Sequence, residues 1–131
     1  MITLLDTSFA IKIVFQHTSI RLLLDCLQKA DWVIAPDVFV SEVTNVFWKY
    51  HQFEDLPLPI CENSLHQTIA LIDDFIDAVE LYQETFGFSC QIQHSVYDAM
   101  YLICARRHNG IFITVDNKLI NLAKKYAIKI P

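Results

Sequence analysis

The sequence predicts an α/β fold, with a mostly parallel sheet that is covered by helices on both faces. Two observations predict it. Short apolar runs alternate with stretches in which apolar residues recur at helical spacing, and helix-starting polar residues follow the apolar runs. This alternation is typical of parallel sheets. A chain of 131 residues, 53% of them hydrophobic, is long enough to bury one core and too short for two. We therefore expect one domain over residues 1–131.

The first half of the chain contains two expected strands and two helical patterns. Residues 2–5 are expected to form a buried strand, which ends at the helix-starting cluster 6–8. Residues 32–35 are expected to form the second strand, after which Asp37 can cap a helix. Apolar residues recur at helical spacing in two places, namely Ile20, Leu23, Leu24 and Leu27, and then Phe39, Val43, Val46, Phe47 and Tyr50.

The second half of the chain continues the alternation. Pro57 and Pro59 indicate a loop that interrupts regular structure. The elements expected after it are, in chain order, a helix at 65–72, a strand near Ala78 and Val79, a helix from Ser95 to about His108, a strand at 111–114, a helix at 119–126 and a short edge strand at 128–130.

Charge is distributed unevenly along the chain, whose formal net charge is −5. Nine acids and no Lys or Arg occur from Tyr50 to Ala105, whereas residues 106–131 contain six basic residues and one acid, Asp116. The net charge disfavours strong nonspecific binding to nucleic acid. The uneven distribution is either a solvated surface or the sign of a phosphate-facing end and a separate face for a basic partner.

Other classes of protein and site are disfavoured. The four cysteines are spread singly, which predicts buried free thiols rather than a zinc site. No apolar run approaches the roughly 20 residues that span a bilayer, and the first residues lack the basic segment of a signal peptide. We therefore expect a cytoplasmic protein without a membrane segment. No P-loop, dinucleotide fingerprint or G-x-S-x-G motif is present.

Three acids fall where an open parallel sheet binds its ligands, which is outside the carboxyl ends of the strands. Asp6 follows the first strand, Asp116 follows the strand at 111–114, and Asp98 lies in the first turn of the preceding helix. Each also has a structural interpretation. Asp6 and Asp116 can cap the helices that they precede, and Asp98 has the capping-box spacing from Ser95.

A fourth acid, Glu42, is either a solvated helix residue or part of the same site. It adjoins the apolar stripe of its helix, so it would lie at the edge of the buried face. Asn45, one turn further along, is an oxygen donor that could support a metal ion or a water molecule.

Four motifs, taken together and in this order, resemble the PIN domain, and most closely the VapC-like toxins of bacterial toxin–antitoxin pairs. They are LLDTS at 4–8, SEVTNVFWK at 41–49, YDAMYLICAR at 97–106 and ITVD at 113–116. The resemblance implies a three-layer α/β/α sandwich. It also implies a metal-dependent endoribonuclease that hydrolyses RNA phosphodiester bonds with Mg²⁺ or Mn²⁺.

The resemblance also assigns residues. The acidic metal-site and catalytic positions correspond to Asp6, Glu42, Asp98 and Asp116, and accompanying polar positions to Asn45, Thr114, Thr7 and Ser8. Carboxylate oxygens suit these hard cations. Lys118, Arg106 or Arg107 could guide the RNA backbone beside the cut bond. The sequence departs from the family in its acidic net charge and in Asn117, which follows Asp116 where some relatives carry a charge.

Partners are implied in the same way: an RNA substrate, a cognate antitoxin that blocks the site, and a second copy in a homodimer. Trp48 is the better interface candidate in an aromatic-rich stretch whose Phe47 and Tyr50 are explained by core packing. The alternative is a PIN-fold binding module without nuclease activity that acts through a protein partner. Two other enzyme classes with an Asp after the first strand are disfavoured. Phosphotransfer enzymes of the haloacid-dehalogenase kind need a D-x-D motif, but Ser8 stands at the place of its second Asp. Response-regulator receivers need an acidic pair after the first strand, which residues 6–8 do not supply.

Overall fold

The computed structural model describes residues 1–15 and 21–131 and contains a four-stranded, entirely parallel sheet in the order β3-β2-β1-β4. Its strands are β1 (Ile2–Leu5), β2 (Trp32–Pro36), β3 (Asp74–Ile76) and β4 (Ile111–Ile113). The helices of the described residues are α1 (Thr7–Val14), α2 (Arg21–Gln28), α3 (Val38–Glu54), α4 (Leu58–Ile69), α5 (Ala78–Ile92), α6 (Val96–His108) and α7 (Asn117–Lys125).

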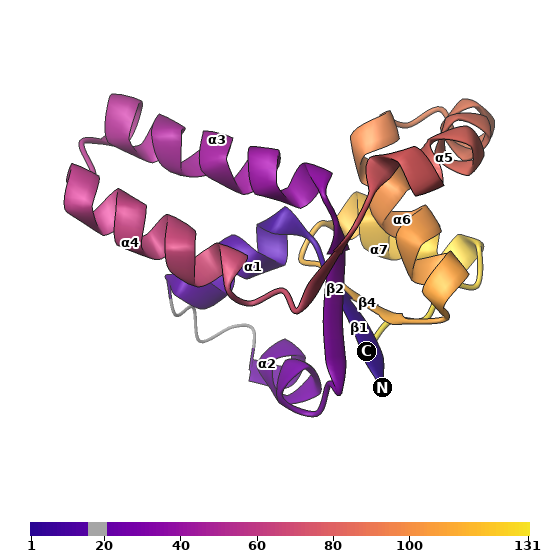
Figure 1. Cartoon of the computed structure of the whole chain (residues 1–131). Coiled ribbons are helices and arrows are strands. Elements are labelled where there is room, and N and C mark those ends of the chain that lie inside the picture. Colours follow the sequence, from indigo (N-terminus) through magenta and orange to yellow (C-terminus); the bar gives the residue numbers. More distant parts are fainter. Residues whose placement is uncertain (16–20) are drawn as a thin grey trace.

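The elements form three layers, as the sequence predicts. Figure 1 shows the sheet nearly edge-on, with α1, α3 and α4 on one side and α5, α6 and α7 on the other. Helices α3 and α4 pack against each other as a long hairpin, and α6 packs on β1 and β2. In the described part of the chain, no helix is long and apolar enough to cross a membrane.

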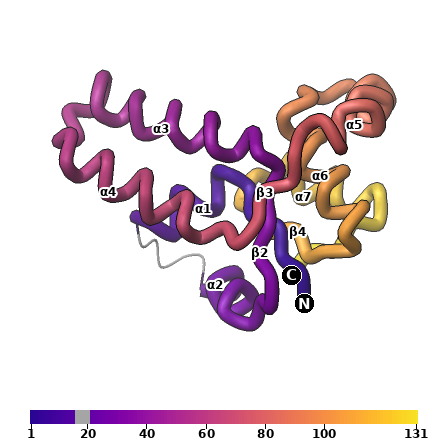
Figure 2. Tube along the Cα trace, in the orientation of Figure 1, coloured from indigo at the N-terminus to yellow at the C-terminus, as the bar shows by residue number. Residues whose placement is uncertain are grey.

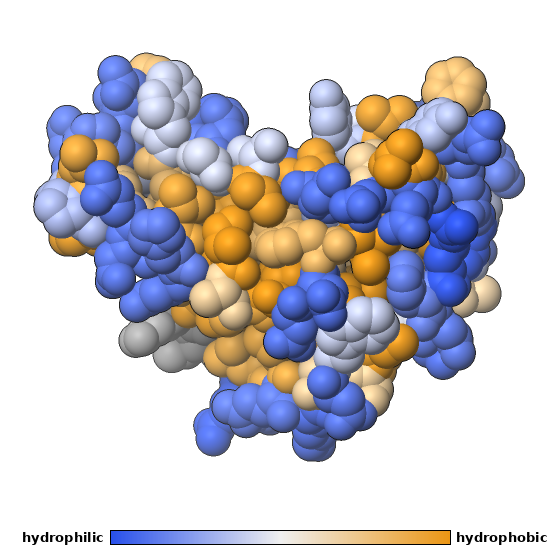
Figure 3. Space-filling view, viewed as in Figure 1, coloured by the Kyte–Doolittle hydropathy of each residue, from blue (hydrophilic) through white to orange (hydrophobic). Residues whose placement is uncertain are grey.

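The core lies on both faces of the sheet. The central strands are continuous apolar runs, and Leu4, Ile34 and Phe112 are fully buried, as expected for strands that helices cover on both sides. The middle of α6, residues 99–105, is buried as well, because this helix lies between the sheet and α5 and α7. Figure 3 shows apolar side chains gathered at the centre of one face, between polar rims.

The common strand direction positions the site. Since all four strands run parallel, the helices that follow them (α1, α3, α5 and α7) begin at the same edge of the sheet (Figure 2). Side chains that are far apart in sequence, but that follow strands or start helices, are therefore brought to one edge.

Two expectations were wrong, one about the third strand and one about the cap formed by Asp37. The strand is β3, and Ala78 already begins α5. Asp37 does not cap α3 through its side chain; its Oδ1 accepts a hydrogen bond from the amide of Ala78 at 3.2 Å and so caps α5. An edge strand of three residues is too short to show an alternating pattern, and the role of Asp37 depends on a contact across 41 positions.

Other expectations were partly met. Helix α2 confirms the helical pattern from Leu23 onward, whereas Ile20 lies outside the described residues. Pro59 does not extend the loop but lies in the first turn of α4, where no backbone donor is lost. Residues 128–130 form no edge strand; their contact with β4 is a hydrogen bond from the amide of Phe112 to the carbonyl of Lys129.

The cysteines are free thiols in different surroundings. Cys61 and Cys104 are buried, as predicted, whereas Cys90 is exposed on α5 and Cys26 is half-buried. Burial raises the pKa of Cys104 to about 12. Its thiol therefore stays protonated and unreactive at neutral pH.

Candidate active site

A pocket of about 480 Å³ opens at the carboxyl ends of β1 and β4. All four acids that the sequence singles out line this pocket, namely Asp6, Glu42, Asp98 and Asp116. We call it the acidic pocket. Its wall also includes Lys12, Tyr101 and apolar side chains of α1 and α3. The acids come from four different elements, and the parallel sheet brings them to one place.

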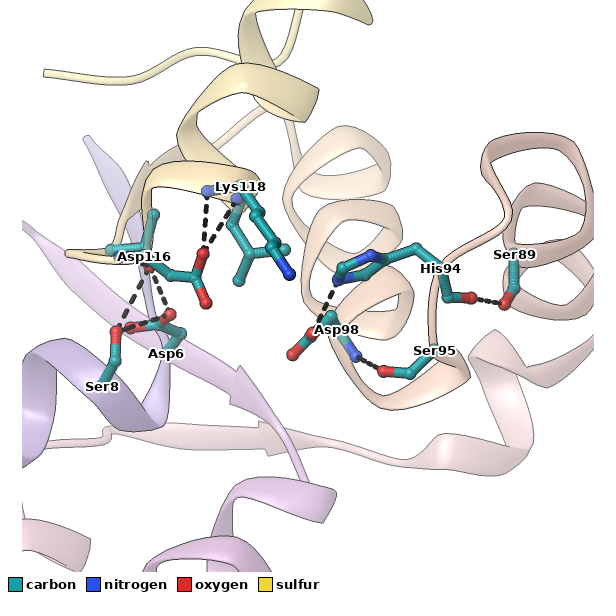
Figure 4. A network of polar contacts seen from close by, with 10 residues as sticks. Asp6, Ser8, Ser89, His94, Ser95, Asp98, Asp116 and Lys118 are labelled. Carbon is teal, nitrogen blue, oxygen red and sulfur yellow. Dashed lines mark hydrogen bonds and ion pairs between the residues drawn. The ribbon is translucent and has the colours of Figure 1, made fainter.

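Asp6 is the most buried of these acids, with 4% of its surface exposed. It is the N-cap of α1, and its Oδ1 accepts a hydrogen bond from the amide of Phe9 at 3.0 Å. The hydroxyl of Ser8 donates to the carboxylate at 2.9 Å, and that of Thr114 donates to Oδ2. The predicted cap is confirmed, and the remaining hydrogen bonds fix the carboxyl group at the base of the pocket (Figure 4).

Burial changes the acidity of Asp6. Removal from water raises its pKa to about 6, against the opposing effect of the hydrogen bonds from Thr114, Phe9 and Ser8; the charge of Asp116 raises it further. Among the described residues, no basic side chain forms an ion pair with Asp6. The negative charge of this carboxylate is therefore poorly compensated in the protein alone.

Asp116 and Thr114 link the end of β4 to Asp6. Oδ1 of Asp116 caps α7 by accepting hydrogen bonds from the amides of Lys118 at 2.8 Å and Leu119 at 3.3 Å. The hydroxyl of Thr114 accepts a hydrogen bond from the amide of Asp116 at 3.0 Å while it donates to Asp6. Thr114 thus connects two acids through hydrogen bonds, and its supporting role in the site stays a prediction.

Glu42 is held by two hydroxyl groups from other elements. Tyr101 on α6 donates to its Oε1 at 2.6 Å, and Thr7 donates to the same oxygen at 3.2 Å. Burial, followed by the charge of Glu42, raises the pKa of Tyr101 far above its ordinary value, so its hydroxyl remains a donor. Sequence reasoning missed Tyr101, because it lies within an apolar helical segment and nothing in its spacing distinguishes it from a core aromatic residue.

Asp98 stands in the first turn of α6, opposite Asp6 and Asp116 in Figure 4. Its amide donates to the hydroxyl of Ser95 at 3.3 Å, which confirms that Ser95 caps this helix. Its carboxylate Oδ2 contacts Nε2 of His94 at 2.8 Å. His94, which the sequence places one helical turn before Asp98, is therefore a direct neighbour of the site.

The structure does not bring every predicted residue to the acidic pocket. Asn45 is exposed on α3 and does not line it. Arg106 forms an ion pair with Glu84 at 2.8 Å and lies over the ring of Phe88, and Arg107 contacts Glu84 and the carbonyl of Glu80. Lys118 lies beside the pocket rather than in its wall.

The donor set suits a hard divalent cation. All four acids supply oxygen ligands to one pocket, and the buried Asp6 carboxylate lacks a compensating charge. Within residues 1–15 and 21–131, however, no three side chains of His, Cys, Asp or Glu lie close enough together to hold an ion as they stand. The chemistry of the donors fits a cation, and its binding would require rotation of these side chains towards one another.

Comparison with known proteins places this chain in a family. The sequence has no significant match among curated proteins. A chain in the crystal structure of VapBC2 from Rickettsia felis bound to a DNA fragment from their promoter is similar in fold, with a TM-score of 0.70 and 16% identity. The similarity covers 100% of this chain and 98% of that one. The family model of the PIN domain matches residues 3–125, and the chain therefore belongs to the PIN domain family.

Proposed function

We propose that this chain is a single-domain, metal-dependent endoribonuclease that hydrolyses RNA phosphodiester bonds. PIN domains are generally nucleases that use divalent metal ions. The observation that carries the proposal is the acidic pocket, in which a buried carboxyl group with a pKa raised to about 6 lies among three further acids. Perturbed acids in a cleft are typical of functional sites.

The acids are arranged so that they retain free ligand atoms. The described hydrogen bonds hold Glu42 through Oε1, Asp98 through Oδ2 and Asp116 through Oδ1. The second oxygen of each remains for a cation. Mg²⁺ or Mn²⁺ would be held by these acids and Asp6, and would supply charge neutralisation at the phosphate and activation of a water molecule.

The test is cleavage of single-stranded RNA in Mn²⁺ by the wild type, Asp6→Asn and Asp98→Asn. We expect a rate loss of at least about 100-fold in both variants, the scale seen when one group that stabilises a transition state is removed. Asp25→Asn on α2 is the control, because Asp25 is exposed and lies outside the acidic pocket. Equal cleavage by all four proteins would identify a contaminant. No cleavage by the wild type would favour a binding module.

Tyr101→Phe tests whether the hydroxyl group that holds Glu42 matters. We expect a cleavage rate about 10-fold lower, and a higher Mn²⁺ concentration for half-maximal rate, as when a residue that orients a metal ligand is lost. The control is Tyr82→Phe, since Tyr82 is 56% exposed on α5. A purely structural role for Tyr101 would lower the melting temperature of Tyr101→Phe and leave its Mn²⁺ dependence unchanged.

We further propose that the protein is the toxin of a toxin–antitoxin pair, acts in the cytoplasm, forms a homodimer and is blocked by a cognate antitoxin. Two exposed surfaces support partners. Trp48 and Phe53 form an exposed edge-to-face pair on α3, with ring centroids 5.7 Å apart, and Val79, Tyr82 and Phe86 form an exposed apolar stripe on α5. Co-purification with a small DNA-binding protein encoded beside this chain would support the pairing, and its absence from the neighbouring reading frames would count against it.

A further inference from the structure

A second pocket, of about 320 Å³, lies next to the acidic pocket and has the opposite charge. It is lined by Ile92, His94, Lys118, Asn121, Leu122 and Lys125. We call it the basic pocket. No acid is among these residues, whereas the acidic pocket is lined by four. The two adjacent pockets therefore carry charges of opposite sign.

The basic pocket arises from one face of an amphipathic helix. Lys118, Asn121 and Lys125 are spaced by three and four residues along α7, so they lie on the same side of it. The opposite side of α7 is anchored in the core by Leu119 and Ala123. The other wall comes from the end of α5 and from His94, which follows that helix. Both walls therefore rest on packed helices.

The two pockets share a wall. His94 lines the basic pocket and Asp98 lines the acidic one, and their side chains are in contact at 2.8 Å. On the other side, the amide of Lys118 donates to the carboxylate of Asp116. Figure 4 shows the Lys118 side chain extending into the space between Asp116 and Asp98. A ligand in the basic pocket is therefore the immediate neighbour of a ligand among the acids.

We propose that the basic pocket binds a backbone phosphate of the RNA strand next to the cut bond. The proposal rests on the proposed nuclease function and assigns the substrate path to Lys118, Lys125 and Asn121. A strand whose scissile phosphate lies among the acids must continue over a neighbouring surface. For an overall acidic chain, this hollow supplies the two cations and the amide donor that a phosphate needs.

The apolar part of the hollow fits the same ligand. Ile92 and Leu122 are half-buried between the polar groups. They offer a nonpolar surface for the sugar or base that accompanies the phosphate, as in other sites for single strands. An acidic protein segment is less suitable, because a carboxylate side chain brings no sugar or base to cover Ile92 and Leu122.

The test is binding of a fluorescent, single-stranded RNA decamer, measured by anisotropy in EDTA at several salt concentrations. The full-length Lys118→Gln/Lys125→Gln variant is compared with Lys124→Gln/Lys129→Gln. The control pair is exposed, removes the same charge from the same end of the chain, and lies outside the basic pocket. We expect the first pair to weaken binding at least 10-fold and to reduce the salt slope by about 0.7, the value for one lost phosphate contact on a single strand. The control pair is expected to change affinity less than 3-fold.

The outcomes separate this inference from the nuclease proposal. Equal losses in both double variants, with RNA still cleaved in Mn²⁺, would overturn the basic pocket and leave the nuclease proposal intact. A polyglutamate peptide that binds the wild type more tightly than the RNA does, and that loses this binding in Lys118→Gln/Lys125→Gln, would also overturn the RNA-phosphate assignment. The nuclease proposal would again stay intact. If the wild type neither binds nor cleaves RNA, both proposals fall.

Discussion

Asp6→Asn is expected to stabilise the metal-free protein at neutral pH while it abolishes RNA cleavage. Burial raises the pKa of Asp6 from 3.8 to about 6, and a shift of that size corresponds to about 3 kcal/mol of lost folding free energy when the carboxyl group is ionised. Asparagine has nearly the same shape and can still cap α1 through its side-chain oxygen. We therefore expect a gain of roughly 1–3 kcal/mol in the free energy of unfolding.

The gain has a defined pH dependence. Because the folded-state pKa of Asp6 is raised, its contribution to stability is fully present below about pH 4 and is lost as pH rises through about 6. The advantage of Asp6→Asn over the wild type should be largest above pH 7 and should shrink as pH falls towards 4.

Urea denaturation in EDTA at pH 5 and pH 7.5 measures this difference directly, with Asp25→Asn as the exposed control. If Asp6→Asn had a lower free energy of unfolding than the wild type at pH 7.5, the ionised carboxylate of Asp6 would stabilise the fold. That result would contradict the view that this carboxylate is destabilising until a cation binds it.

The positions of three of the acids were predictable because they depend on local patterns, whereas Glu42 was assigned by the PIN-domain resemblance. Asp6 and Asp116 each follow an apolar run and precede a helix, and Asp98 follows a helix cap by three residues. Parallel strands bring such positions to one edge of the sheet. The fold class alone was therefore enough to expect Asp6, Asp98 and Asp116 at one edge of the sheet, and the resemblance added Glu42.

The support for these acids could not be predicted in the same way. The hydroxyl of Tyr101 reaches Glu42 across 59 positions, and Thr114 reaches Asp6 across 108. Tyr101 lies in a fully buried part of α6, where the sequence reads as core. The PIN-domain resemblance supplied Thr114, whereas Tyr101 required the structure.

Arg106 is a residue that the sequence suggested for the site and that the structure places elsewhere. Its place in a basic segment made it a candidate for contact with RNA, but the packing of α6 against α5 sets it beside Glu84 and Phe88. Lys118 and Lys125, in the same basic end of the chain, remain exposed and line the basic pocket. The packing of the helices decides which basic side chains remain free to contact RNA. The spacing of these residues in the sequence does not reveal it.

Binding of a divalent cation is expected to be the other large effect. An ion that binds the folded state alone, at 100 times its dissociation constant, stabilises it by about 2.7 kcal/mol. For a domain of this size that corresponds to a rise in melting temperature of roughly 10 °C. The rise should be large because the cation would compensate four carboxylates that share one pocket, among them the buried Asp6.

Thermal denaturation with and without Mn²⁺ or Mg²⁺, for the wild type, Asp6→Asn and Asp116→Asn, tests most directly whether the four acids form one metal site. We predict that Mn²⁺ raises the melting temperature of the wild type and of Asp25→Asn by roughly 10 °C, that EDTA reverses the rise, and that both pocket variants lose most of it. If neither ion shifts the melting temperature of the wild type and EDTA has no effect, the acidic pocket is not a metal site.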